Sequence, residues 1–370
     1  MEHNFLDYYN QELTFVREMA REFAERHPKI AGRLGMQGIE TADPYVERLI
    51  ESFCFLSART QMKLDAEFPK FTQRLLDIIY PNYNSPMPSM GVVQLQPNLK
   101  EGDLTQGYVI PKKSTFYSRL LPGEMTRCEF RNNQDVTLWP LDIAEVRLTS
   151  VPPDIPNLEI HRLNHQQLKG ALRIKLRLQG DLVFSDLNGL DELPIYIQGD
   201  ERVVSHTFEL LHSRHVAVVV RSGDGEKNQH HVIVKDALKF EGLAPDQSLL
   251  PLQWNMFHGH TLIQEYIACR ERFYFFSIAQ LATALEGNNT NEVEFIILLN
   301  TLPQDLVPHL DASRFLLHCT AVINLFPKRV DRIEVNRALN NFHIVPDRSR
   351  PMDYEVFSVD KVFGLQAETS

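Results

Sequence analysis

A histidine and a cysteine stand side by side in the apolar run "RFLLHCTAVINLF" at residues 314–326. Such a pair can serve as nucleophile and general base when the imidazole can take the thiol proton. The run predicts a strand over 316–323, and adjacent side chains of a strand point to opposite faces. His318 therefore cannot act as the base for Cys319, and we interpret Cys319 as a small buried side chain.

The other histidines could be metal ligands. His230 and His231 are adjacent on a predicted strand, so they point apart. In "FHGH" at 257–260, His258 and His260 can share a face, and Glu265 follows nearby. A metal site needs three or four converging ligands supported by further hydrogen bonds. No additional ligand stands at a motif spacing, so we predict no metal site.

No other catalytic motif occurs in the chain. The loop "SGDGE" at 222–226 lacks the Gly-Lys-Ser/Thr ending of a phosphate cradle, and no Gly-x-Ser-x-Gly occurs. The four cysteines include no Cys-x-x-Cys, which favours a reducing compartment. We predict no catalytic residue and no cofactor. A Cys- or metal-dependent hydrolase and a free-standing ligand-binding β domain stay as alternatives.

Composition narrows the class of protein. The chain has 370 residues, of which 43% are hydrophobic and 23% charged, so we expect a globular protein with two or more domains. The net charge of −10 and the lack of a basic stripe argue against a nucleic-acid partner. The acidic start is unlike a signal peptide, and the apolar runs are too short to span a bilayer. We expect a cytoplasmic protein without membrane insertion.

The N-terminal residues 4–26 predict one amphipathic helix with two apolar stripes. The first has heptad spacing and comprises Leu6, Tyr9, Leu13, Val16, Ala20 and Phe23. A second stripe beside it comprises Phe5, Tyr8, Phe15 and Met19. A helix with two neighbouring stripes can contact two partners at once, whereas one stripe suffices for docking on its own domain. We expect this helix to form a bundle with helices of another chain.

Further helices and a boundary follow. Asp43 and Pro44 predict the start of a helix that runs to about residue 66. Pro69 is expected to lie early in a third helix, because proline is tolerated in the first turn, and this helix should end before Pro81. Three prolines in "YPNYNSPMPS" at 80–89 mark the end of the helical part.

Beyond residue 90 the apolar pattern has a period of two. In "ALRIKLRLQ" at 171–179, leucine and isoleucine alternate with Arg173, Lys175 and Arg177, which predicts a half-buried antiparallel strand with a basic outer face. "HVAVVVR" and "HHVIVK" predict a hairpin. The other expected strands are 91–96, 136–149, 273–278, 293–299, 316–323, 331–335 and 354–362, with short helices at 201–213, 261–268 and 304–311.

These patterns predict an α+β fold in which a helical N-terminal region precedes a larger, mainly antiparallel β-rich part with short helices. We expect four regions: a partner-binding helix at 1–27, a helical domain at 28–86, a β-rich α+β domain at 87–250 and a second β-rich region at 251–370. The last region has no obvious stop signal, and we expect it to continue beyond residue 370.

Several long segments together resemble one family, TssF, a baseplate subunit of bacterial type VI secretion systems (VasA/ImpG-like). They are "YYNQELTFVREMAREFAERHPKIAGRL" at 8–34, "DPYVERLIESFCFLSARTQMKLDAEFPKFTQRLLDIIYPNYNSPMPSM" at 43–90, "TLIQEYIACRERFYFF" at 261–276, "HLDASRFLLHCTAVINLFPKRVDRIEV" at 309–335 and "HIVPDRSRPMDYEVFSVDKV" at 343–362. The sequence departs from the family in "FHGHT", at the start of the match at 261–276. Ala321 replaces the proline of the family's Cys-Thr-Pro-x-x-Asn-Leu-Phe signature. Family members are also longer than this chain.

The resemblance implies a structural role without catalysis. It implies a fold related to phage tail baseplate wedge proteins. The implied partners are TssG, a second TssF copy, TssK and TssE in the wedge, together with the spike hub (VgrG) and the cytoplasmic part of the membrane complex. The implied location is a baseplate docked at the inner face of the inner membrane. We hypothesise that the N-terminal residues Leu6, Tyr9, Leu13, Val16, Ala20, Phe23, Phe5, Phe15 and Met19 bind partner helices, with the basic strand at 173–177 as the alternative docking face.

Overall fold

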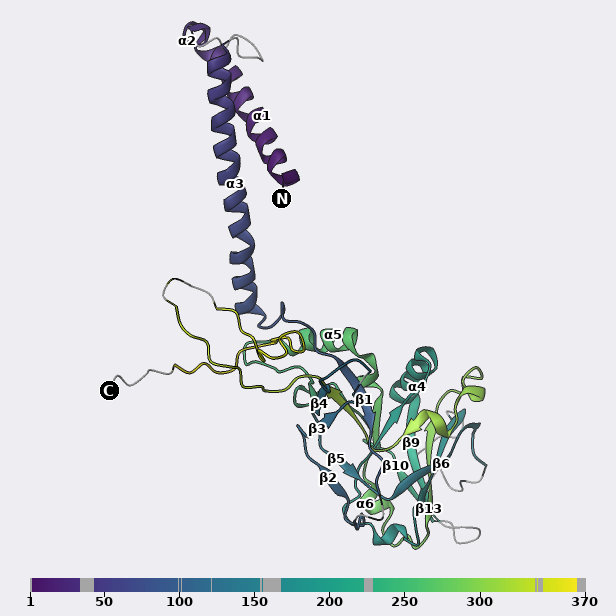
Figure 1. Cartoon of the computed structure of the whole chain (residues 1–370). Coiled ribbons are helices and arrows are strands. Elements are labelled where there is room, and N and C mark those ends of the chain that lie inside the picture. The colour runs from purple at the N-terminus through teal and green to yellow at the C-terminus, as the bar shows by residue number, and fades with distance from the viewer. Residues whose placement is uncertain are drawn as a thin grey trace, which may run out of the picture. The chain divides into compact units, whose positions relative to one another are not determined.

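The computed structural model describes residues 2–33, 43–98, 100, 102–120, 122–153, 155, 168–222, 229–336, 338 and 342–364 (Figure 1). The chain divides into two compact units, Met1–Asn84 and Ser85–Ser370. We name them the helical unit and the β-rich unit. Their content is the predicted α+β combination of an N-terminal helical region and antiparallel sheets with short helices.

The helical unit contains α1 (Glu2–Arg26), α2 (Pro28–Arg33) and α3 (Pro44–Ile79). Asp43 caps α3 as expected, because its carboxylate accepts the backbone N–H of Tyr45 at 2.9 Å and Pro44 takes the first turn. The predicted helix break at Pro69 is wrong. Pro69 lies inside one continuous helix, and the Thr72 hydroxyl donates to the Pro69 carbonyl at 2.9 Å. A proline removes one N–H bond but does not by itself end a helix that packing supports.

The β-rich unit is built from short antiparallel strands. They are β1 (Met90–Gln94), β2 (Tyr108–Ile110), β3 (Thr115–Tyr117), β4 (Glu129–Asn132), β5 (Val136–Leu138), β6 (Leu141–Ser150), β7 (Gly170–Leu178), β8 (Leu193–Ile197), β9 (His215–Ser222), β10 (Gln229–Ile233), β11 (Leu238–Phe240), β12 (Phe275–Ile278), β13 (Glu292–Leu299), β14 (Phe315–Leu316) and β15 (Cys319–Ile323). The helices are α4 (Glu201–Arg214), α5 (His258–Ala268), α6 (Leu281–Ala284) and short 3₁₀ turns, among them η6 (Arg270–Phe273).

Two sheets enclose the main core. The five-stranded sheet has the order β10-β9-β13-β7-β6, and a four-stranded sheet has the order β11-β12-β8-β14. One apolar cluster joins Leu172, Ile174 and Leu176 of β7 to Ile195 of β8 and Phe276 of β12, all of them buried. The inward face of β7 is therefore the alternating face that the sequence predicts. A further sheet, β1-β15-β4-β3, and the pair β2-β5 complete the unit.

The two predicted halves of the β-rich part share their sheets. β13, from the predicted second region, lies between β7 and β9 of the first, and β15 pairs with β1. Residue 250 therefore falls inside one compact unit. The β9–β10 hairpin is present as predicted, and its loop 223–228 lies outside the described residues. No strand forms at 331–335 or at 354–362, where strands were expected.

The predicted strand 316–323 is interrupted at His318. β14 ends at Leu316 in the sheet with β8, and β15 begins at Cys319 in the sheet with β1. His318 adopts a left-handed conformation with φ of 57° at this switch. Its ring accepts the backbone N–H of Trp139 at Nε2, at 3.1 Å, which ties the switch to the chain before β6. This buried hydrogen bond helps to hold a backbone conformation that side chains other than glycine seldom adopt.

Candidate assembly surfaces

Helices α1 and α3 pack side by side in opposite directions (Figure 1). The rings of Phe5 and Phe55 meet edge to face at 5.2 Å between centroids. The Tyr8 hydroxyl donates to the Asp65 carboxylate at 2.8 Å. On α3, the small side chains of Cys54 and Ala58 are fully buried. Small residues at these positions allow the two helix backbones to approach closely.

The residues of the predicted partner-binding seam fall into two groups. Tyr9, Leu13, Val16 and Ala20 are half-buried in the pair of helices. Burial and then the charges of Glu51 and Cys54 on α3 raise the pKa of Tyr9, which places its ring beside α3. The other group stays at the surface, with exposed fractions of 54% for Leu6, 56% for Phe15, 51% for Met19 and 38% for Phe23. Phe5 packs on Phe55.

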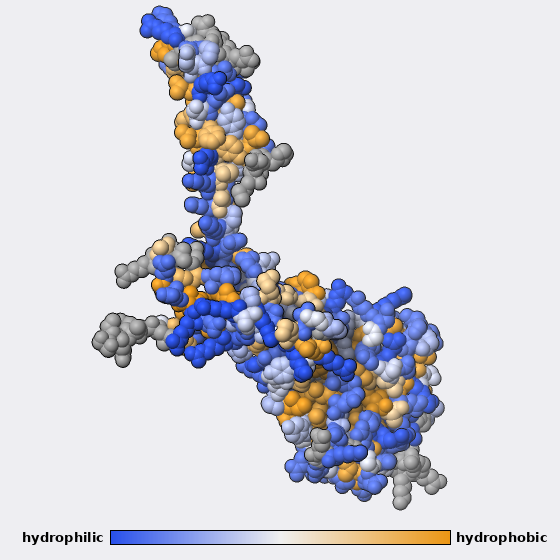
Figure 2. All heavy atoms as spheres, in the orientation of Figure 1, coloured by the Kyte–Doolittle hydropathy of each residue, from blue (hydrophilic) through white to orange (hydrophobic). Residues whose placement is uncertain are grey.

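A longer apolar surface runs along α3. We name it the α3 stripe, and it comprises Tyr45, Leu49, Phe53, Leu56, Leu64, Phe68, Phe71, Leu75 and Ile78. Their exposed fractions range from 47% to 83%. The residues recur every three or four positions, apart from one interval bridged by Thr60, so they share one face of the helix. Figure 2 shows apolar side chains at the surface of this unit.

The apolar pattern of this helix is visible in the sequence, but the exposure of the α3 stripe is not. Leu49, Phe53 and Leu56 belong to the apolar pattern that predicts the helix. An amphipathic pattern shows that a face will be covered, but it does not show by which chain. In the structure α1 covers the neighbouring face, at Cys54 and Ala58, and leaves the stripe exposed.

The predicted alternative docking face on β7 is neutralised within its own sheet. Arg173 forms a two-pronged ion pair with Glu294, with distances of 2.7 and 2.8 Å. Lys175 and Arg177 both pair with Glu292, at 2.5 and 2.6 Å. These hydrogen bonds lower the pKa of Glu292. The basic residues therefore face an acidic neighbouring strand, and the face carries little free charge for a partner.

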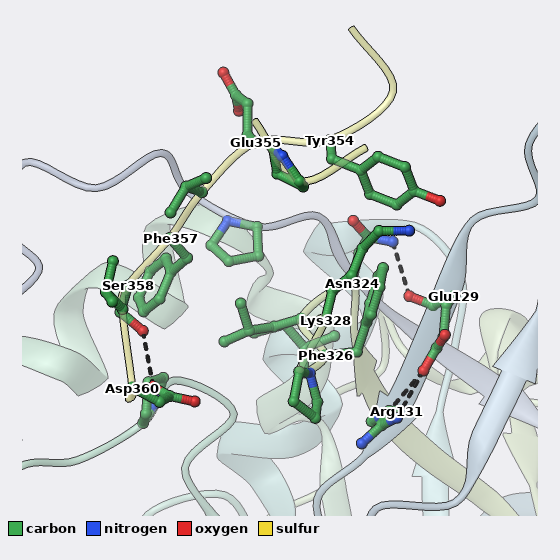
Figure 3. A pocket seen from close by; sticks show the side chains of 18 of the residues that line it. Glu129, Arg131, Asn324, Phe326, Lys328, Tyr354, Glu355, Phe357, Ser358 and Asp360 are labelled. Atoms are coloured by element: carbon green, nitrogen blue, oxygen red, sulfur yellow. Dashed lines mark hydrogen bonds and ion pairs between the residues drawn. The ribbon is translucent and has the colours of Figure 1, made fainter. Parts of the chain in front are cut away.

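The β-rich unit also has an open crevice of about 2470 Å³ (Figure 3). Several of its polar groups contact one another. Arg131 bonds to Glu129 at 2.8 Å, Asn324 donates to the Glu129 carbonyl at 2.8 Å, and the Lys328 ammonium lies 3.9 Å from the centroid of the Tyr354 ring. Enzyme sites bring several polar or titratable groups to bear on one point, whereas these side chains are directed at one another.

The candidate catalytic and metal-binding residues are either buried in an unreactive form or paired with another side chain. Burial lowers the pKa of His318 to about 4 and raises that of Cys319 to about 12, so neither is poised as a base or a nucleophile at neutral pH. Glu265 is paired with Arg272 in the interior and is not free to bind a metal beside His258 or His260. Among the described residues, no three His, Cys, Asp or Glu side chains gather into a metal-binding group.

Within the described part of the chain, none of the helices combines the length and the apolar composition needed to cross a bilayer. The helical unit presents a pair of helices with uncovered apolar faces. Uncovered apolar surfaces of this kind are typical of sites that contact other proteins.

The chain belongs to the TssF family of the type VI secretion system, whose model matches residues 1–370. It is 41% identical over 366 residues to the type VI secretion system component TssF1 of Pseudomonas aeruginosa (strain PAO1), covering 98% of this chain and 58% of that protein. It also resembles a chain of a TssK-TssF-TssG baseplate subcomplex solved by cryo-electron microscopy, with a TM-score of 0.65 and 26% identity over 85% of this chain and 55% of that one. This chain thus spans little more than half the length of these relatives.

Proposed function

We propose that this protein is a non-catalytic subunit of a type VI secretion baseplate wedge, and that helices of a TssG-type subunit cover its α3 stripe. The observation that carries the proposal is the stripe itself. It extends over 34 residues, Tyr45 to Ile78, which is about 50 Å of helix at 1.5 Å per residue. A single exposed leucine is common on a protein surface, whereas a continuous apolar face of this length is typical of a helix that joins a bundle.

A TssG-type partner is supported by the structural relative, which was solved together with TssG and TssK. The stripe contains no charged side chain, so its partner should present an apolar helix face. In the proposed bundle the exposed α1 residues Leu6, Phe15, Met19 and Phe23 contact the TssG-type subunit or a second TssF-type copy. The half-buried α1 residues Tyr9, Leu13, Val16 and Ala20, with Phe5, hold α1 on α3.

The wider assembly is part of the same proposal and rests on family membership. It places TssK-type and TssE-type subunits in the wedge, around a VgrG-type spike hub. It also places the baseplate at the inner face of the inner membrane, in contact with the cytoplasmic part of the membrane complex. In this role the chain needs no cofactor and no nucleic acid.

The test is co-purification with the TssG-type subunit from the same source. Leu49→Asp with Phe53→Asp places two charges in the α3 stripe. This should weaken binding by at least about tenfold, because each charge must lose its hydration in the contact or keep the two surfaces apart. The matched control is Ala66→Asp with Gln73→Asp, which adds the same charge at exposed positions of α3 that are not three or four residues from any residue of the stripe.

Helix content by circular dichroism verifies that both double variants retain the α1–α3 pair. Undiminished co-purification of Leu49→Asp with Phe53→Asp would remove the α3 stripe as the TssG-type contact. Equal loss in the control would show that charge alone, and not the stripe, determines binding.

A further inference from the structure

Helix α5 has its polar face turned inward. Thr261 and Glu265 are buried, with exposed fractions of 1% and 0%. On the other side of the same helix, Ile263, Tyr266 and Ile267 have exposed fractions of 61%, 49% and 76%. A helix on the surface of a protein normally has the reverse arrangement, with its apolar stripe on the core.

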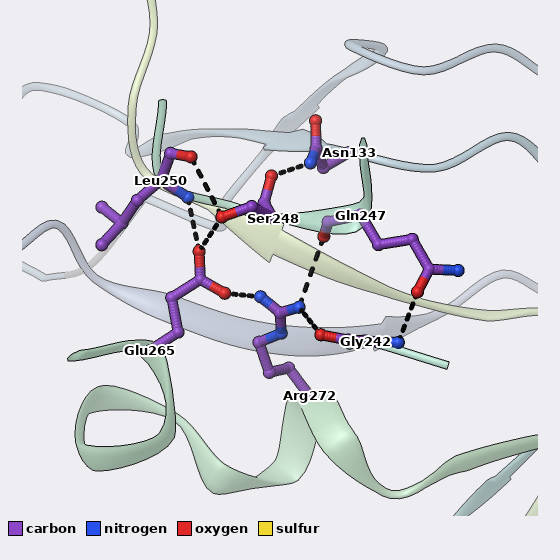
Figure 4. A network of polar contacts seen from close by, with 7 residues as sticks. All are labelled: Asn133, Gly242, Gln247, Ser248, Leu250, Glu265 and Arg272. Carbon is purple, nitrogen blue, oxygen red and sulfur yellow. Dashed lines mark hydrogen bonds and ion pairs between the residues drawn. The ribbon is translucent and has the colours of Figure 1, made fainter. Parts of the chain in front are cut away.

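A buried polar network explains how α5 is held in this orientation (Figure 4). Glu265 pairs with Arg272 of η6, and its Oε1 accepts the Leu250 backbone N–H at 2.8 Å and the Ser248 hydroxyl at 2.6 Å. Arg272 donates to the Gly242 carbonyl at 2.6 Å. The loop before α5 thereby finds partners for its backbone groups. Since this network fixes the inner face, the apolar residues of α5 are left for another contact.

The exposed side of this segment forms what we name the α5 patch, defined as Trp254, Phe257, Ile263, Tyr266 and Ile267. Trp254 is 97% exposed and Phe257 is 72% exposed. Between residues 249 and 269 the only Asp, Glu, Lys or Arg is the buried Glu265. Tryptophan and tyrosine are enriched in the residues that dominate binding energy, and charged residues are depleted from interface cores.

We propose that the α5 patch binds the uncharged apolar face of a helix from another protein subunit. The inference rests on the proposed function only in placing that subunit in the same assembly. A peripheral membrane helix would carry Lys or Arg along its polar face, and the polar face of α5 is instead occupied by Glu265 and Thr261 in the interior. The exposed stripe has helical spacing and extends over about 16 Å, the length of 11 residues, which suits a single partner helix.

The chain contains its own reporter for this contact. Of its two tryptophans, Trp139 is buried at 4% exposure and Trp254 is almost fully exposed. The difference in emission between the wild-type chain and Trp254→Phe therefore reports on Trp254. We expect long-wavelength emission and strong acrylamide quenching in the isolated chain. In the purified complex with TssG-type and TssK-type subunits, emission should shift to shorter wavelength and most of the quenching should be lost.

Two variants test which side chains make the contact. Ile263→Asp with Ile267→Asp should weaken the contact and restore the quenching of Trp254 in the complex. The control Val234→Asp changes an apolar residue that is 48% exposed just after β10 and should leave the protection unchanged. A photo-crosslinking amino acid at position 263 should attach to a helix of a partner subunit in the same complex.

Four other outcomes overturn the proposal, and a fifth, loss of the complex itself, concerns the proposed function. Trp254 that stays quenchable in an intact complex shows that the patch is not a contact, whereas failure to form any complex contradicts the proposed function instead. Protection that grows with concentration of the chain alone identifies a second copy as the occupant. Protection by vesicles of anionic phospholipid identifies a membrane surface, and protection already present in the dilute isolated chain identifies another part of the same molecule.

Discussion

Glu265 and Arg272 form an ion pair whose side chains are 0% and 1% exposed, seven residues apart across the end of α5. Burial lowers the pKa of Arg272 to about 10, which still leaves the guanidinium charged at neutral pH. Glu265 also accepts the Leu250 backbone N–H and the Ser248 hydroxyl, and Arg272 donates to the Gly242 carbonyl, all in the preceding loop. The pair therefore holds the loop before α5 against this helix, a role that apolar packing usually has.

Breaking this pair should destabilise the protein strongly. Arg272→Met leaves the Glu265 carboxylate buried without its counter-charge, so we expect a loss of about 3–5 kcal/mol in the free energy of unfolding. The double variant Arg272→Met with Glu265→Gln should lose less than the sum of the single changes, because no unpaired charge remains. Urea unfolding followed by circular dichroism measures all three variants.

A nearby arginine provides the control. Arg270 also forms an ion pair, with Glu201, but its side chain is 48% exposed. Arg270→Met should cost less than about 1 kcal/mol. If the losses for Arg270→Met and Arg272→Met are similar, or if the Arg272 and Glu265 changes are additive, the buried pair does not hold the loop against α5.

The sequence alone does not predict this pair. Its spacing suggests only that Glu265 could be a metal ligand with His258 and His260, since spacing on a helix is the only geometry that a sequence provides. Its partner, Arg272, lies beyond the end of α5 in a 3₁₀ turn. Whether two charges meet across such a turn depends on the path of the backbone, and no periodicity encodes that path.

Regular elements were predicted well where one pattern dominates. The alternating leucines and isoleucines of β7 and the apolar pattern of α4 are local signals, and both elements are present. The break at His318 was missed because it needs a positive φ at a residue that is not glycine. The strands expected at 331–335 and 354–362 have the strand pattern but no neighbouring strand in the described residues, and pairing is a property of the partner as well as the sequence.

The cysteines test the assignment as a non-enzyme. Cys54, Cys269 and Cys319 are buried and Cys128 is exposed. Burial raises the pKa of Cys269 to about 11 and that of Cys319 to about 12, so their reactive thiolates are scarce at pH 8. We expect iodoacetamide to modify one thiol rapidly and the other three only after unfolding. Mass spectrometry identifies the site.

Cys128→Ser provides the matched control and should remove the rapid phase. A catalytic Cys319 predicts the opposite pattern. Its thiolate would have to be populated and accessible, so rapid modification of Cys319 in the folded chain would reopen the hydrolase alternative.

His318 should make stability depend on pH in a defined window. Burial lowers its pKa to about 4 in the folded chain, against about 6.5 for a histidine in an unfolded chain. Above pH 6.5 the imidazole is neutral in both states, and its acceptor bond from Trp139 is fully present. As the pH falls from 6.5 to 4, the unfolded state takes up a proton that the folded state does not, so stability falls by roughly 3 kcal/mol.

The measurement compares urea unfolding of the wild-type chain and of His318→Gln at several pH values from 7.5 to 4.5. Glutamine can offer an amide oxygen to the Trp139 N–H but does not titrate. Near pH 7.5 the variant should be equally stable or less stable, because the amide must reproduce a buried hydrogen bond. Towards pH 4.5 the difference in free energy should move in favour of the variant. A difference that stays constant over this range would show that His318 is not kept neutral by burial, and that the junction between β14 and β15 tolerates a charged ring.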